Sequence, residues 1–171
     1  MVHWSDSGFV FEEVLGRRLP GIYAFALFVT GDRGDRAETL LIATVEQAFE
    51  RHLGGEDASD ALDRSFVTEA WRIPGPRATR PIQPLRPTTQ DLRAITSLEP
   101  AALRQAALRV PVPARLAIWL VVVERRSYAE VTRILGVDRD TLSDLLAWRD
   151  AMIGLALAET RGSDGHASTA S

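Results

Sequence analysis

Residues 127–152, SYAEVTRILGVDRDTLSDLLAWRDAM, impose the strongest constraint on how this chain folds. Ser127 followed three positions later by Glu130 is the pattern of a capping box, which predicts that a helix begins directly after the serine. Gly136 suits the left-handed position that ends such a helix, and Asp138 suits the cap of a second one. The stretch therefore predicts two short helices joined by a three-residue turn.

A third helix is expected just before this pair. Leu116, Trp119, Leu120 and Val123 recur at the spacing of one helical face, which indicates a helix with an apolar stripe for packing. Two short helices joined by a glycine-containing turn, behind such a helix, are typical of the helix-turn-helix of DNA-binding proteins. A plain helical hairpin is the alternative interpretation.

Composition divides the chain into four parts. We predict an all-α fold of two small helical domains, residues 1–71 and residues 98–157, with the helix-turn-helix in the second. Residues 72–97 contain five of the nine prolines together with five arginines, and they predict an extended, basic linker because proline disfavours helix. This linker is either a solvated tether or a surface for nucleic acid, nascent RNA or an acidic protein groove. Residues 158–171 are small and polar, which predicts a disordered tail.

Helix signals in the first domain are weaker but present. Asp35 and Glu38 form an Asp-x-x-Glu pattern, which predicts a capped helix start. That helix is expected to run to about Leu53 and to end at the glycine pair that begins with Gly54. Another short helix is predicted over residues 60–71.

Composition also narrows the chemistry and the compartment. Cysteine is absent, so disulfides and thiolate metal sites are excluded, and the three histidines show no metal-ligand spacing. No phosphate loop or nucleophile elbow occurs, so we expect neither an enzyme nor a bound cofactor or metal. No signal peptide is recognised and no apolar run approaches the roughly 20 residues that span a bilayer, which favours a soluble, cytoplasmic protein without membrane contact. The net charge of −3 argues against a strong, sequence-independent grip on nucleic acid.

The second domain resembles a known family. Residues 107–146, ALRVPVPARLAIWLVVVERRSYAEVTRILGVDRDTLSDLL, resemble region 4, the promoter −35-binding domain of bacterial sigma factors, and are most similar to the extracytoplasmic-function group. Residues 23–49, YAFALFVTGDRGDRAETLLIATVEQAF, are more loosely similar to region 2. The features that carry the first likeness are Val110-Pro111, Ser127-Tyr128-Ala129-Glu130-Val131, Leu135-Gly136-Val137 and Thr141-Leu142.

This resemblance implies a transcription-initiation factor that binds core RNA polymerase and promoter DNA. By analogy, region 2 would hold the polymerase clamp and the −10 element, and region 4 would hold the −35 element. In the first domain, Phe66 and Trp71 would stack on unpaired bases, or else they belong to the core. The residues that would contact DNA in the second domain are Arg139, Thr141, Ser143 and Arg149.

Several positions depart from the family's pattern. The second helix of the pair carries acidic residues where the family commonly has basic or polar ones, and acid repels phosphates. Ile42 and Ala43 occupy positions where the family has a polar Gln-Glu pair at the polymerase clamp. The four acids at or near the second helix are Asp138, Asp140, Asp144 and Asp150.

The end of the second domain is unusually apolar. We expect the second helix of the pair to continue through residues 142–156, and its apolar residues would then span an arc of about 200°, although about 100° suffices for a core stripe. These residues are Leu142, Leu145, Leu146, Trp148, Met152, Ile153, Leu155 and Ala156. Either a small domain buries more of its last helix, or Leu145, Trp148 and Met152 anchor a protein-binding face. The second interpretation leads to an alternative function: a sigma mimic or interaction module that binds an anti-sigma factor, or itself as a homo-oligomer, without recognising DNA.

Overall fold

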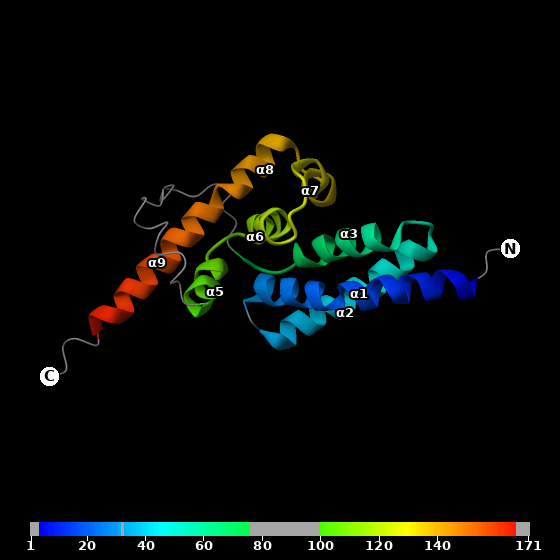
Figure 1. Ribbon diagram of the computed structural model, residues 1–171, viewed down its shortest axis with the longest axis horizontal. Helices are drawn as coiled ribbons and strands as arrows, with labels where there is room; N and C mark the ends of the chain where they lie inside the picture. The colour runs from blue at the N-terminus through cyan, green and yellow to red at the C-terminus, as the bar shows by residue number, and fades with distance from the viewer. Residues whose placement is uncertain (1–3, 32, 76–99, 167–171) are drawn as a thin grey trace.

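The computed structural model describes residues 4–31, 33–75 and 100–166 (Figure 1). Within these ranges the ordered elements are helices and no strand occurs, which confirms the predicted all-α class. The elements are α1 (Trp4–Thr30), α2 (Gly34–Leu53), α3 (Ala58–Ala70), α5 (Pro100–Leu108), α6 (Val112–Ile118), the π-helical turn η2 (Trp119–Val123), α7 (Tyr128–Leu135), α8 (Arg139–Leu146) and α9 (Trp148–His166).

The helices α1, α2 and α3 form the first half, in which α2 packs against both of the others. The helix α2 ends at Leu53 and is followed by Gly54, as predicted. Its start differs, because the cap position is Arg33, whose side chain makes no capping hydrogen bond. Asp35 therefore lies in the first turn of α2, where its negative charge interacts favourably with the positive end of the helix dipole. The predicted role of Asp35 as the cap residue is wrong. In α3 the cap is Asp57, whose carboxylate accepts hydrogen bonds from two backbone amides.

The second half begins with α5, and the helix predicted over residues 116–123 is present in two parts. It starts as α6 and changes at Trp119 into the wider turn η2, which closes with a hydrogen bond from the Glu124 amide to the Trp119 carbonyl. A π-helical turn of this kind is a local insertion that shifts the following residues around the helix axis.

The pair α7 and α8 follows the predicted capping pattern. The Glu130 amide donates to Ser127 Oγ at 3.3 Å, and the Glu130 carboxylate accepts from the Ser127 amide at 2.9 Å. Gly136 has φ = 66°, the left-handed conformation that glycine adopts without steric cost. Asp138 caps α8 by accepting a hydrogen bond from the Thr141 amide at 2.7 Å. The helix α7 therefore starts and stops, and α8 starts, where the sequence indicates. The expected single helix through residues 142–156 is wrong, because α8 ends at Leu146 and α9 begins at Trp148.

The last helix, α9, is longer than expected. The predicted disordered tail begins at residue 158, whereas α9 continues to His166, so that part of the prediction is wrong. Residues 167–171 and most of the predicted linker, residues 76–99, lie outside the described residues. None of the described helices is both long enough and apolar enough to cross a membrane.

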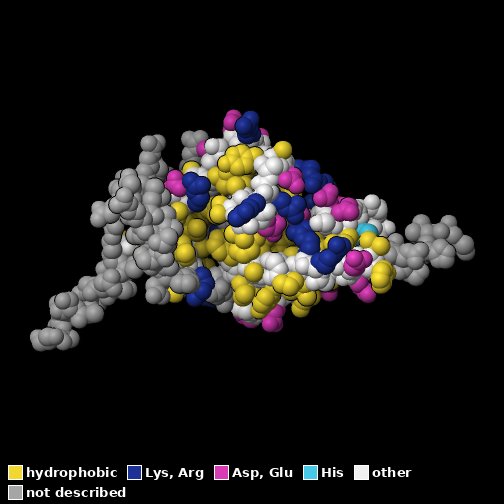
Figure 2. All heavy atoms as spheres, viewed as in Figure 1, with side chains coloured by type: hydrophobic (Ala, Val, Ile, Leu, Met, Phe, Trp, Pro, Cys, Tyr) yellow, Lys and Arg dark blue, Asp and Glu magenta, His cyan; other side chains and the backbone are white. Residues whose placement is uncertain are grey.

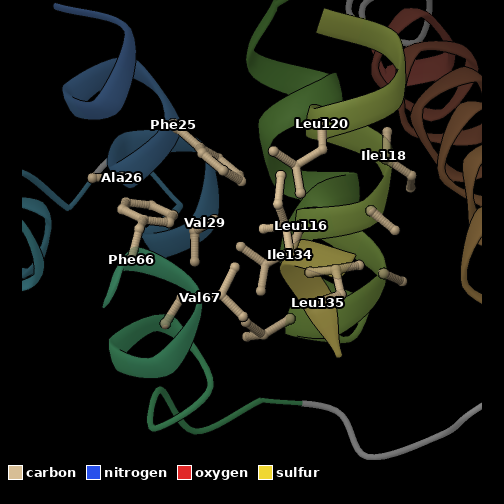
Figure 3. Packing of buried hydrophobic residues seen from close by; sticks show 14 of the residues in the cluster. Phe25, Ala26, Val29, Phe66, Val67, Leu116, Ile118, Leu120, Ile134 and Leu135 are labelled. Carbon is tan, nitrogen blue, oxygen red and sulfur yellow. The ribbon is translucent and has the colours of Figure 1, made fainter. Parts of the chain in front are cut away.

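A single core joins the two halves (Figure 3). Phe25 of α1 stacks on Phe66 of α3, with ring centroids 4.4 Å apart, and on Trp119 of η2, with centroids 5.0 Å apart. Figure 3 shows side chains of α1 and α3 facing Leu116 and Ile134 of the second half. We call this contact between the halves the seam.

Candidate nucleic-acid interface

The helix α8 presents a polar face to solvent. Leu142 and Leu145 are buried because α8 packs against α6 and α7. The predicted DNA-contacting residues Arg139, Thr141 and Ser143 are all exposed on the remaining surface of the helix. The structure therefore brings these three residues together on one accessible helix.

The centre of that polar face is acidic. Because successive residues of a helix are about 100° apart, Asp140 lies on the side of α8 opposite the buried Leu142 and Leu145, and Asp144 lies one turn further along the same side. Asp140 and Asp144 form an acidic ridge. Arg139 and Ser143 lie on one side of this ridge, and Thr141 lies on the other. An approaching phosphate would therefore meet carboxylates before it met the guanidinium group, which reduces the electrostatic attraction to DNA.

Two of the other acids have structural roles. Asp138 is the cap of α8, and the hydrogen bond from the Thr141 amide holds the pKa of its carboxyl below the ordinary value. Asp150 lies 3.1 Å from Arg149, so it neutralises a predicted DNA-contacting cation. Arg149 lies on α9, beyond the Ala147 turn, and is exposed. Part of the acidity noted in the sequence therefore serves capping and local ion pairing.

The three residues predicted to anchor a protein partner are buried. The exposed fractions of Leu145, Trp148 and Met152 are 7%, 8% and 8%. Leu145 lies on α8, which packs against α6 and α7, whereas Trp148 and Met152 lie on α9, which packs against α5, α6 and α8. The interpretation that the last helix is buried more deeply than usual is confirmed, and the expected exposed face at these residues is wrong.

The two aromatic residues of the first half differ in exposure. Phe66 is buried and stacked on Phe25, so the interpretation of Phe66 as a core residue is confirmed. Trp71, at the end of α3, is 48% exposed and is accessible for stacking on a base. Arg72 beside it donates two hydrogen bonds to Glu69, at 2.8 and 2.9 Å.

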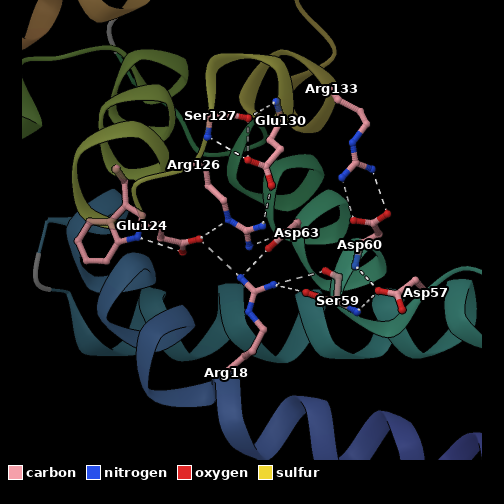
Figure 4. Close-up of polar contacts among 11 residues, drawn as sticks. Arg18, Asp57, Ser59, Asp60, Asp63, Glu124, Arg126, Ser127, Glu130 and Arg133 are labelled. Carbon is pink, nitrogen blue, oxygen red and sulfur yellow. Dashed lines mark hydrogen bonds and ion pairs between the residues drawn. The ribbon is translucent and has the colours of Figure 1, made fainter.

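A polar network across the seam carries residues that sequence analysis did not single out (Figure 4). Asp63 of α3 is buried and lies 2.7 Å from Arg18 of α1 and 3.2 Å from Arg126, just before α7. Glu124 contacts both arginines, at 3.7 and 3.3 Å. These residues are far apart in sequence and are not joined by a local motif, so nothing in the sequence pattern identified them.

A second ion pair lies beside this network. Both terminal nitrogens of Arg133 on α7 donate to the carboxylate of Asp60 on α3, each at 3.0 Å. On the face shown in Figure 2, arginine side chains lie next to acidic ones rather than forming a separate basic area. The network and this pair together are called the rim of the seam, because they border its apolar centre.

Comparison of the chain with models of protein families finds no match, and comparison with curated proteins finds none either.

Proposed function

We propose that this protein is a divergent sigma-factor-like regulator of transcription initiation, which works in the cytoplasm and binds core RNA polymerase and promoter DNA. In this proposal α7, the turn at Gly136 and α8 form the helix-turn-helix of a second domain, and α8 is the recognition helix. The observation that supports it best is the capped α7–α8 pair, which leaves Arg139, Thr141 and Ser143 exposed while the leucines of α8 are buried.

The charges on α8 predict how this binding would behave. Arg139 has no ion-pair partner among the described residues, so its charge is available for a phosphate or a guanine. Asp140 is exposed at the centre of the same face and opposes phosphate contact. We therefore expect weak affinity for DNA by the isolated protein, with a shallow dependence on salt. Selective binding would require the polymerase to hold the DNA nearby.

A protein-interaction module is the second candidate. The acidic ridge of α8 favours this second function, because its carboxylates repel DNA. Ile42 of α2 favours it as well, since this apolar side chain is 59% exposed at a position where the resembled family has a polar residue. In this case the protein binds an anti-sigma factor or a second copy of itself. The buried Leu145, Trp148 and Met152 are not its anchors in this structure.

The deciding experiment combines the full chain, core polymerase and a library of random promoters. Formation of a holoenzyme that retains selected sequences supports initiation. In that assay Arg139→Ala is expected to reduce retention about tenfold, because one good base or phosphate contact contributes about 1–3 kcal/mol. Arg17→Ala is the matched control, since this arginine is exposed on α1 and its nearest carboxylate, that of Glu13, lies 3.7 Å away.

A second variant tests the role of the acidic ridge. Asp140→Asn is expected to raise retention, because it removes repulsion without changing side-chain shape. A wild-type protein that binds neither polymerase nor DNA would exclude the proposal. Equal retention by wild type, Arg139→Ala and Arg17→Ala would exclude α8 as the reading helix.

A further inference from the structure

The seam has the composition of a core rather than of a contact between mobile domains. Phe25 is 4% exposed and lies between an aromatic ring of the first half and one of the second. Leu116 and Leu120 of the second half are buried in the same cluster, as is Val67 of the first. An apolar contact between two parts of a chain opposes their relative motion, and the centre of the seam is apolar.

A buried arginine ties the halves together at another point of the seam. Arg115 of α6 is 3% exposed, and its Nε donates to the Val110 carbonyl at 3.0 Å. Its guanidinium also donates to the Val29 carbonyl, near the end of α1. Burial lowers the pKa of Arg115 to about 10, and the two carbonyl oxygens accept hydrogen bonds from its buried guanidinium group. Separating the halves would break a hydrogen bond that links α6 to α1.

The rim fixes the relative orientation of the halves. The Asp60–Arg133 pair uses two parallel hydrogen bonds, a geometry that specifies direction as well as distance. Arg125 has φ = 55°, a strained conformation for a residue with a side chain, and it lies between Glu124 and Arg126, both of which contact Arg18 or Asp63 of the first half. Such strain persists where the surrounding contacts determine the backbone.

The docked halves set an upper limit on the reach of the protein along DNA. From Asp60 to Trp71 the α3 helix rises about 16 Å, and from Arg133 to Arg139 the chain spans at most about 20 Å. When the lengths of the paired Asp60 and Arg133 side chains are added to these two spans, Trp71 and the start of α8 lie within roughly 50 Å of each other. Promoter elements centred at −10 and −35 are about 25 base pairs apart, which is roughly 85 Å at about 3.4 Å per base pair.

We infer that the two halves stay docked as one rigid body when the protein binds its target, so that it reads one short, contiguous DNA site instead of two separated promoter elements. This inference rests on the proposed function for the DNA part and on the seam for the rigid body. It departs from what the family resemblance implies, in which each half holds its own element.

A distance measurement tests the rigid body directly. The chain contains no cysteine, so Glu46→Cys on α2 and Ala147→Cys between α8 and α9 accept spin labels at two exposed positions only. We expect one narrow distance distribution that is unchanged when core polymerase, or polymerase with selected promoter DNA, is added. A longer distance that appears with either addition would overturn the inference.

Tethering the halves tests the DNA part. In Asp60→Cys·Arg133→Cys, a short bis-maleimide bridges the positions of the exposed ion pair, and the same variant capped with a monofunctional maleimide is the control. The tethered protein is expected to retain selected DNA within about twofold of the control, and the selected sequences are expected to show one enriched block. A tenfold loss on tethering, or two enriched blocks separated by about 15 base pairs or more, would overturn the contiguous site. Absence of DNA retention in both forms would exclude the proposed function, while the label distances still decide whether the halves stay docked.

Discussion

The centre and the rim of the seam hold the same two halves together by different physics. The centre is made of stacked aromatic rings and aliphatic side chains, represented by Phe25 between Phe66 and Trp119. The rim is made of ion pairs, from the buried Asp63 to the exposed Asp60. Apolar burial is strong, non-directional and not screened by salt, whereas ion pairs are directional and weaken with exposure and with salt. The centre therefore supplies most of the stability, and the rim selects one orientation.

The largest effect is expected at the centre. Phe25→Ala removes a ring from two stacking contacts, and we expect the free energy of unfolding to fall by about 3 to 5 kcal/mol, as for other buried aromatic truncations. Urea unfolding followed by tryptophan fluorescence measures it, because Trp119 lies against Phe25. The control is Phe9→Ala, since Phe9 is 69% exposed. Equal effects of the two variants would show that the seam does not form in solution.

The second-largest loss of stability is expected at the buried part of the rim. Asp63→Asn removes the closer of the two carboxylates that Arg18 and Arg126 share and leaves Glu124 in place. We expect a loss of about 2 kcal/mol, less than the roughly 3 to 5 kcal/mol for a fully buried pair, because both arginines keep Glu124 and some solvent contact. Chemical denaturation measures the loss, and high salt should reduce it only slightly. Glu13→Gln is the control, because Glu13 pairs with Arg17 at 3.7 Å on the open surface. A loss no larger than that of the control would mean that the network contributes nothing beyond a surface pair.

The cap that joins the rim to α7 should have a smaller effect. Ser127→Ala removes the hydroxyl that accepts from the Glu130 amide, and capping losses of this kind are about 1 kcal/mol. Glu130 also approaches Arg126 at 3.7 Å, so the variant should loosen α7 as well as destabilise it. Hydrogen exchange of the α7 amides is the measurement, with the α2 amides as an internal reference. Unchanged α7 exchange would contradict a capping role.

The smallest effect is expected at the exposed pair and depends on pH. The hydrogen bonds from Arg133 hold the pKa of Asp60 below its ordinary value of 3.8 in the folded protein. The unfolded protein therefore binds the proton more readily, so this pair stabilises the fold above about pH 4 and its contribution is lost as the pH falls through the lower folded value. Comparing wild type with Asp60→Asn between pH 7 and pH 3 should show a small difference that shrinks as the pH falls below about 4. A difference that grows toward acid pH would contradict the pairing.

The local elements of the second half were predictable because their signals act over a few residues. Ser127 with Glu130, Gly136 and Asp138 specify where α7 begins and ends and where α8 begins, and the structure places each of them in its predicted role. No local signal marked the end of α8 at Leu146. The same logic failed at Asp35, where the backbone entered the helix two residues earlier and left the acid in the first turn. A capping pattern is informative only when the residue takes the extended backbone of the cap position.

The sequence by itself determined the helical class, the α7–α8 turn and the polar surface of α8, since helix propensity, capping and periodicity are properties of neighbouring residues. Only the tertiary structure decided that Leu145, Trp148 and Met152 are buried, and that Arg18, Asp63 and Arg126 meet across the seam. Periodicity states that a face is apolar but not what covers it, and an ion pair between distant residues depends on how whole helices pack. The separation into independent halves, which composition suggested, gives way to one shared core for that reason.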